Sequence, residues 1–259
     1  MGHMKFAAFD FDGTILFDSG IPDPTLEAIH RWQDAGHLAV AATGKSLKAA
    51  EYALKDYDIT FDYSVLFTGA VVAKGHDEIL YEQYLPTETV EKILDMLSTV
   101  QGISCFGTRL WERDARFLDT RNGDSDTSIL VDYEDMSPDE IPHHQFIGIP
   151  IWVPGDDTLR QQLVDRIRSS FDCECVTNQD FIDIIPADCT KGTGLAWLAT
   201  HLGVPRSEVE LYTFGDSFND LAMHEVADES FSFTWSPEEV RKRTTNVVTG
   251  VEKPLDELR

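Results

Sequence analysis

Short runs of consecutive apolar residues recur in the first third of the chain, and segments with helical signals separate them. The runs read MKFAAF at Met4–Phe9, LAVAAT at Leu38–Thr43 and SVLFT at Ser64–Thr68. An unbroken apolar run of this length is typical of a strand that is covered on both faces. Strands that alternate with helices pair in parallel, because each helix carries the chain back across the sheet. The pattern therefore predicts an α/β fold with a parallel sheet.

The helices between these runs have recognisable starts. Asp23 is expected to cap a helix whose first position is Pro24, since proline is well tolerated there, and Gly36 can end it. Ser46–Leu54 is expected to form the next helix. One helix therefore follows each of the first two strands.

The pattern changes at about Tyr84. Apolar residues at i, i+3, i+4 and i+7 from Val90 predict an amphipathic helix over Thr87–Thr99. Several strands mixed with two long helices indicate an α+β module with a partly antiparallel sheet. Its other expected elements are strands at Ile103–Phe106, Arg109–Glu112 and Phe146–Val153, a helix at Asp156–Ser169, and a hairpin of Glu174–Thr177 and Phe181–Ile185.

The buried-strand pattern returns after Pro186. We expect helices at Gly192–His201 and Asp220–Ala227, and strands at Leu211–Gly215, Phe231–Thr234 and Asn246–Thr249. The chain is therefore expected to hold one α/β domain, residues 1–83 and 188–259, interrupted by an inserted α+β domain, residues 84–187.

The net charge of the chain limits its partners. Its 259 residues include 46 Asp and Glu against 21 Lys and Arg, a formal charge of -25. Such a field repels nucleic acid and anionic membranes, because Lys and Arg supply most of the affinity for phosphate backbones. No apolar stretch approaches the roughly 20 residues that span a bilayer. We expect no nucleic-acid and no membrane partner, and a site for an anionic substrate would need a cation nearby.

The cysteines and the first residues favour a cytoplasmic protein. MGHM at Met1–Met4 resembles the remnant of a tag, and no charged and then apolar leader follows it. The four cysteines show no CxxC pair and are expected to be free thiols. They are Cys105, Cys173, Cys175 and Cys189.

Polar side chains follow several predicted strands at the point where each strand ends. Asp10 and Asp12 follow the first strand, Thr43 ends the second, and Asp216 follows LYTFG. In an open parallel sheet, ligands bind outside the carboxyl ends of the strands, so these groups are expected around one crevice. Lys191 stands apart, just before the helix expected from Gly192.

Clustered carboxylates indicate a bound cation. Two unit charges 4 Å apart repel by about 4 kcal/mol at an effective dielectric constant of 20. Mg²⁺ suits such oxygen ligands and prefers one or two carboxylates together with substrate phosphate. In this interpretation Asp10 attacks phosphorus, Asp12 protonates the leaving oxygen and then deprotonates water, and Lys191 stabilises the transferring group.

Four ordered segments carry a resemblance to a known family. DFDGT at Asp10–Thr14, TGK at Thr43–Lys45, CTKGTGL at Cys189–Leu195 and GDSFND at Gly215–Asp220 resemble the four motifs of the haloacid dehalogenase (HAD) superfamily. The insert between the second and third motifs is similar to the type IIB cap of the Cof-like subfamily of sugar-phosphate phosphatases. The resemblance implies a doubly wound core, Mg²⁺ dependence and phosphoryl transfer through an aspartyl-phosphate.

The resemblance also implies a role for each matching residue. Asp10 would be the nucleophile and Asp12 the acid/base. Phosphate would be bound by Thr43, Gly44, Lys191 and Asn219; Mg²⁺ would take the Asp10 carboxylate, the Asp12 backbone carbonyl and Asp216; and Asn219 and Asp220 would orient Lys191 and metal-bound water.

Two stretches depart from the family pattern. Lys45 stands where the second motif usually has arginine, and lysine lacks the bidentate fork of a guanidinium group. Family members commonly carry a Gly-Asn pair where this chain reads SFTWSPEEV, Ser232–Val240. Neither change removes the expected nucleophile, acid, lysine or metal ligands.

Other interpretations stay open. Each motif alone is compatible with a strand-end turn or a helix cap. The ordered set is also compatible with a mutase of the same fold, a phosphoacceptor signalling domain without turnover, or a catalytically silent binding protein. A receiver-type signalling domain would lack the large insert, and product analysis would separate a mutase from a phosphatase.

The sequence therefore predicts a Mg²⁺-dependent phosphatase of a small phosphorylated metabolite, with a sugar phosphate as the expected class. The insert is expected to act as a lid that excludes water and selects the leaving group. Candidate lid segments are Thr108–Arg113, His143–His144 and Asn178–Phe181, and Arg109 or Arg113 could meet a second anionic group. The substrate itself and the oligomeric state do not follow from the sequence.

Overall fold

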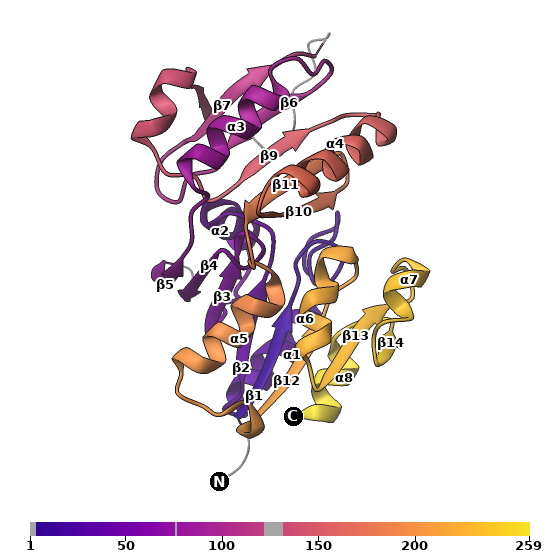
Figure 1. The fold of residues 1–259 in the computed structure, drawn as a ribbon. Coiled ribbons are helices and arrows are strands. Elements are labelled where there is room, and N and C mark those ends of the chain that lie inside the picture. The colour runs from indigo at the N-terminus through magenta and orange to yellow at the C-terminus, as the bar shows by residue number, and fades with distance from the viewer. Residues whose placement is uncertain (1–3, 76, 122–131) are drawn as a thin grey trace. The chain divides into compact units, whose positions relative to one another are not determined.

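The computed structural model describes residues 4–75, 77–121 and 132–259. The chain forms two compact units (Figure 1): the first comprises Met1–Tyr81 and Thr190–Arg259, and the second comprises Glu82–Cys189. The assignment of a catalytic core and a lid to such units stays a prediction. No helix among the described residues is long and apolar enough to cross a membrane.

An eight-stranded sheet forms the centre of the first unit, in the order β14-β13-β12-β1-β2-β3-β4-β5. The pairs from β14 to β3 are parallel, and β4 runs antiparallel to β3. The sequence prediction of a parallel-sheet α/β core is confirmed. The strands are β1 (Met4–Phe9), β2 (Leu38–Ala42), β3 (Tyr63–Leu66), β4 (Val71–Lys74), β5 (Glu78–Glu82), β12 (Val209–Phe214), β13 (Glu229–Phe233) and β14 (Asn246–Val248).

Helices cover both faces of this sheet, as Figure 1 shows. Phe6 and Ala8 of β1 pack with Leu195 and Met223 on the face covered by α5 and α6. On the opposite face the indole of Trp32 in α1 meets the ring of Tyr212 edge-on. The helices of this unit are α1 (Asp23–Asp34), α2 (Leu47–Leu54), α5 (Lys191–His201), α6 (Leu221–Val226), α7 (Glu238–Arg241) and α8 (Glu252–Leu258).

The predicted third strand ends earlier than expected. β3 stops at Leu66, and Phe67 and Thr68 adopt positive φ angles of 47° and 54°. Their amides donate to the carbonyls of Lys45 and Thr43, so the chain bends over the end of β2. It then returns as β4, which the sequence analysis missed, since a short apolar run has no period that separates a hairpin strand from a loop.

Two helices begin one residue earlier than predicted. Asp23 is the first residue of α1 rather than its cap, and Pro22 occupies the cap position without a side-chain hydrogen bond. Lys191 is the first residue of α5 rather than the residue before it, because Thr190 accepts a hydrogen bond from the amide of Thr193 and caps the helix. This places Lys191 on a rigid helical turn.

The second unit is an α+β module, as predicted. Its six strands follow the order β10-β11-β9-β6-β7-β8, all antiparallel neighbours except the parallel β7 and β8. Residues of α3 and α4 pack with one face of this sheet in a common apolar core. The elements are α3 (Thr87–Leu97), β6 (Ser104–Gly107), β7 (Asp114–Asp119), β8 (Tyr133–Asp135), β9 (Ile149–Trp152), α4 (Asp157–Ser170), β10 (Cys173–Asn178) and β11 (Phe181–Pro186).

One of the strands predicted for this unit, at Arg109–Glu112, does not form. Arg109–Glu112 lies in the turn before β7, and the guanidinium of Arg109 is buried between the carboxylates of Glu112 and Glu134. An arginine that satisfies its donors within the turn stabilises the turn rather than a strand. The predicted hairpin is confirmed, with β10 and β11 antiparallel.

Stacked aromatic rings fix the strands that carry the first unit's site. The Phe214 ring stacks on those of Phe9 and Phe231 at 5.1 and 4.7 Å between centroids, and Phe214 is fully buried.

We expect Phe214→Ala to lower the free energy of unfolding by about 3–5 kcal/mol, since the substitution would leave a cavity between packed strands. Urea unfolding measures this. Tyr52→Ala, at a side chain that is 69% exposed, is the control and should change little.

Candidate active site

Three neighbouring strands bring polar residues to one edge of the first unit's sheet. β1 lies between β2 and β12, so Asp10, Thr43 and Asp216 follow adjacent strand ends. The amide of Asp10 still donates to the carbonyl of Phe214 at 2.9 Å, which extends the β1–β12 pairing to the aspartate itself. The carboxylate of Asp10 is thereby held at the carboxyl edge, where the sequence placed it.

Lys191 joins two of the acids. Its side chain is completely buried, and its Nζ donates to Oδ1 of Asp10 at 2.7 Å and to Oδ1 of Asp220 at 2.6 Å. The other carboxylate oxygen of Asp220 accepts from the amide of Ser217 at 3.0 Å. A buried ammonium needs such partners, because an unpaired buried charge is strongly destabilising.

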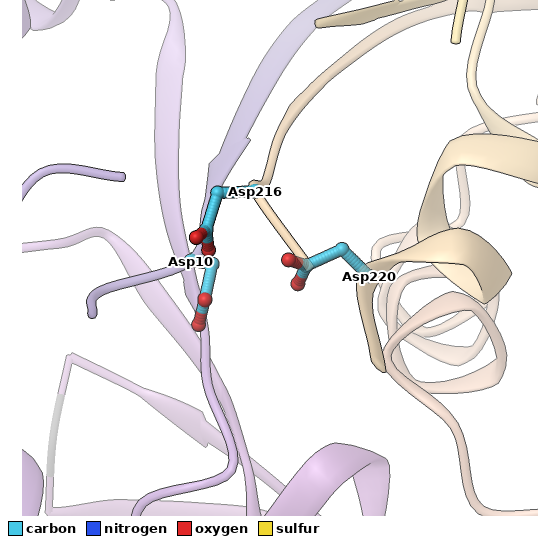
Figure 2. A group of neighbouring side chains, drawn as sticks. All are labelled: Asp10, Asp216 and Asp220. Atoms are coloured by element: carbon cyan, nitrogen blue, oxygen red, sulfur yellow. The ribbon is translucent and has the colours of Figure 1, made fainter. Parts of the chain in front are cut away.

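The carboxylates of Asp10, Asp216 and Asp220 form an acidic cluster. One oxygen from each lies within 4.8 Å of the others, and Figure 2 shows the three side chains directed toward a common space. Three carboxylates face the single ammonium of Lys191, so the cluster has an excess of negative charge when ionised. Hard oxygen ligands at this spacing fit a divalent cation such as Mg²⁺.

Burial and the nearby charge of Asp220 make Asp10 and Asp216 hard to ionise. Burial, followed by the charge of Asp220, raises the pKa of Asp10 to about 7, although Lys191 opposes the shift. The same two causes raise the pKa of Asp216 to about 6. For Lys191, burial favours the neutral amine, but the two carboxylates prevail and raise the pKa of its ammonium group. A cation in the cluster would favour the ionised acids.

Asp12 points out of this cluster. Its side chain is 56% exposed, and its Oδ2 lies 2.7 Å from Nζ of Lys45. The residue that departs from the family motif therefore makes an ion pair with the predicted acid/base. Because both groups are partly hydrated, the pair orients Asp12 more than it stabilises the fold.

The remaining predicted site residues lie close by on the same edge. Thr43 is buried, and its Oγ1 accepts from the amide of Lys45 at 3.2 Å. Gly44 is exposed, and a Cβ there would lie 3.3 Å from Oγ1 of Thr68. Oδ1 of Asn219 accepts from Oγ of Ser217 at 2.7 Å. The phosphate-binding roles of these residues stay predictions.

Glycine is required at the turn after Asp12. Gly13 has a φ of 79°, and a Cβ at this position would lie 2.5 Å from Oδ2 of Asp216. Only a residue without a side chain lets the turn approach the acid this closely. The DFDGT and GDSFND segments therefore touch directly.

The sequence analysis missed a contact of Trp235. Its Nε1 donates to the carbonyl of Gly13 at 2.9 Å, across 222 positions of the chain. Trp235 lies in the segment Ser232–Val240, which departs from the family pattern, and no residue pattern in that segment predicts this partner. A tryptophan in a turn gives no sequence signal for the carbonyl that it meets.

The candidate residues of the second unit are largely engaged with each other. Nδ1 of His144 lies 3.2 Å from Glu112, which also pairs with Arg109. Arg113 pairs with Asp132 at 2.7 Å. Recognition of a second anion by either arginine would thus compete with existing ion pairs. In the predicted lid segment Asn178–Phe181, the side chain of Asn178 lies outside the described part of the structure.

Comparisons with known proteins agree with this geometry. A sequence model of the haloacid dehalogenase-like hydrolases matches residues 7–253. An HMP-PP phosphatase from Yersinia pseudotuberculosis is 28% identical over 226 residues, covering 85% of this chain and 80% of that protein. One from Klebsiella pneumoniae is 26% identical over 223 residues, with the same coverage.

Solved structures share the fold over nearly the whole length. The HAD subclass IIB sugar phosphatase BT4131 matches with a TM-score of 0.80 at 20% identity and covers 98% of this chain and 99% of its own. A haloacid dehalogenase-like hydrolase from B. subtilis matches with a TM-score of 0.82 at 19% identity and covers 99% and 100%. Each of these two alignments therefore extends over both compact units of this chain.

The raised pKa values predict how stability depends on pH without divalent ions. Asp216 has a pKa of about 6 in the folded protein against 3.8 for the free side chain, so the folded state binds the proton more tightly. Its contribution to the free energy of unfolding should fall as pH rises from about 4 to 6 and then stay level. In EDTA, we expect the free energy of unfolding of the Asp216→Asn variant to fall less than that of wild type between pH 4 and 6. The variant should therefore be more stable than wild type at pH 8.

Thermal unfolding at a series of pH values in EDTA measures this dependence. Asp95→Asn, at an exposed position of α3, is the matched control and should follow the wild-type curve. Parallel curves for wild type and Asp216→Asn would contradict the raised pKa.

Proposed function

The chain belongs to the haloacid dehalogenase-like hydrolases, and we propose that it is a Mg²⁺-dependent phosphatase that acts on a small phosphorylated metabolite through an aspartyl-phosphate. The observation that carries this proposal is the buried Lys191 held between Asp10 and Asp220, beside Asp216. A binding domain for a neutral ligand would have no use for so costly a charge network.

Asp10 is the proposed nucleophile. Its carboxylate oxygen forms a bond to phosphorus while the bond from phosphorus to the leaving oxygen breaks, which gives an aspartyl-phosphate and an alcohol. Water then attacks the same phosphorus, the bond to Asp10 breaks, and inorganic phosphate leaves. Lys191, whose ammonium group already donates a hydrogen bond to Asp10, would neutralise charge on the phosphoryl oxygens in both steps.

Asp12 is the proposed acid and base. As the acid it gives its proton to the leaving oxygen, and as the base it takes one from the attacking water, so the group ends the cycle as it began. Its exposure and its flexible lysine partner suit a group that must face a substrate. Thr43 and Gly44, on the adjacent strand end, are proposed to hold the phosphate.

Mg²⁺ would be held by Asp10 and Asp216, with the backbone carbonyl of Asp12, while Asp220 mainly orients Lys191. When bound, the ion supplies the positive charge that lets an anionic phosphate approach a cluster of carboxylates. The fit rests on the three carboxylate oxygens gathered within 4.8 Å.

A sugar phosphate is the proposed substrate class, supported by the fold shared with a subclass IIB sugar phosphatase. A second candidate is HMP-PP, the compound in the names of the curated relatives at 26–28% identity. The unit Glu82–Cys189, inserted between the second and third motifs, is proposed as the lid that chooses between such leaving groups.

A mutase of the same fold would return the phosphoryl group to another hydroxyl, and a phosphoacceptor domain would stop at the aspartyl-phosphate. Steady release of inorganic phosphate separates the proposed enzyme from both.

A cytoplasmic location is also proposed, supported by four free cysteines.

Replacement of the nucleophile tests the proposal. We expect Asp10→Asn to lower turnover by at least about a thousandfold, because a carboxamide cannot form the acyl phosphate. Phosphate release is measured with Mg²⁺ over a panel of sugar phosphates and HMP-PP. EDTA should abolish wild-type activity and Mg²⁺ should restore it.

The control for this experiment is Asp95→Asn, which removes an exposed carboxylate of the second unit and should leave activity unchanged. Undiminished phosphate release from Asp10→Asn would rule out Asp10 as the nucleophile. Higher kcat/KM for HMP-PP than for every sugar phosphate would overturn the proposed substrate class but not the mechanism.

A further inference from the structure

We propose that Trp235 is a positioning residue that fixes the turn carrying Asp12 and thereby aligns the acid/base for proton transfer to the leaving group. The inference rests on the proposed function of Asp12. It assigns a role to the stretch where this chain departs from the family's usual Gly-Asn pair.

The hydrogen bonds within the turn converge on a single acceptor. The amides of the three residues after Gly13 all donate to the one carbonyl of Phe11, at 2.8–3.1 Å. The amide of Gly13 donates to the carbonyl of Leu16 at 2.9 Å. Since three donors share one acceptor, the turn lacks the regular ladder of a strand, and a bond from outside has a larger effect on its position.

Trp235 supplies such a bond from a rigid support. Its indole stacks on the ring of Phe233, with 4.7 Å between centroids and 14° between planes, and Phe233 is fully buried. The turn that carries Trp235 is closed by a bond from the amide of Ser236 to the carbonyl of Phe233 at 2.9 Å. The indole N–H that reaches Gly13 is therefore held in place before any substrate binds.

The indole contacts the catalytic segment at two points. Besides the bond to the Gly13 carbonyl, the ring of Phe17 meets it edge-on at 5.8 Å, with planes at 77°. One contact lies within the turn Phe11–Leu16, and the other lies at the residue that follows it. A single indole thus restrains the turn at two separate positions.

The turn is also fixed from two other directions. Gly13 packs against the carboxylate of Asp216, and the side chain of Asp12 pairs with Lys45 at 2.7 Å. The ion pair is partly hydrated and therefore weak, so it does not by itself protect Asp12 against a misplacement of about 1 Å, which can lower a rate about a hundredfold. Trp235 supplies the missing restraint on the backbone.

Hydrophobic burial alone does not account for Trp235. The residue is 46% exposed, so its burial contributes less than that of a core aromatic residue. The side chain is placed so that its one polar atom meets the carbonyl next to Asp12. A role in alignment explains both the exposure and the bond.

Trp235→Phe tests the inference, because it keeps an aromatic ring against Phe233 and removes only the N–H donor. The probe is kcat/KM for two substrates: p-nitrophenyl phosphate, whose leaving group departs without a proton, and an alkyl phosphate, whose leaving group needs one. We expect kcat/KM to fall about tenfold for the alkyl phosphate and less than about twofold for p-nitrophenyl phosphate. Asp12→Asn should show the same selectivity with a larger loss.

The matched control is Trp197→Phe, at a half-buried indole of α5 that stacks on the ring of His201 with 4.8 Å between centroids, and it should leave both values unchanged. The thermal midpoint of Trp235→Phe is measured alongside and should stay close to that of wild type. Equal losses for both esters, or none for the alkyl phosphate, would overturn the inference. If the wild type itself releases no phosphate, both the proposed function and this inference are overturned. If the wild type is active, the two variants test the role of Trp235 separately from the proposed function.

Discussion

The buried ammonium of Lys191 is the interaction on which the site depends. It lies between the carboxylates of Asp10 and Asp220, at 2.7 and 2.6 Å, with no exposure to solvent. A charge in this position is tolerable only when all its partners are present. The first strand, the GDSFND turn and the start of α5 must therefore come together for any one of them to be stable there. The same arrangement leaves an excess of carboxylates, which is what a divalent cation requires.

Close backbone approach makes this arrangement possible. A Cβ at Gly13 would lie 2.5 Å from the carboxylate of Asp216, and one at Gly215 would lie 2.4 Å from Cγ of Asp220. Neither contact leaves room for a side chain. Both acids are thus packed against turn backbone, and burial raises the pKa of Asp216. The burial of these charges costs stability locally, and strongly shifted pKa values of this kind are common in active sites.

The sequence was informative where local physics decides the structure. Apolar runs of five or six residues located the ends of β1 and β2 to within one residue and those of β12 to within two, because a strand covered on both faces has little freedom in composition. It was less informative where tertiary contacts decide. β4 was missed, and Arg109–Glu112 was assigned to a strand although its arginine folds back onto Glu112 and Glu134. Neither the return of the chain after Thr68 nor these ion pairs leaves a periodic signal.

By itself, the sequence determined the α/β class, the inserted α+β module and the acids at the strand ends, since hydrophobic periodicity and the geometry of parallel sheets act locally. The tertiary structure alone decided which partners those residues meet. It directed Asp12 toward Lys45 and brought the indole of Trp235 to the carbonyl of Gly13. These pairs join segments up to 222 positions apart, and their choice depends on packing and desolvation in the folded chain rather than on the identity of neighbouring residues.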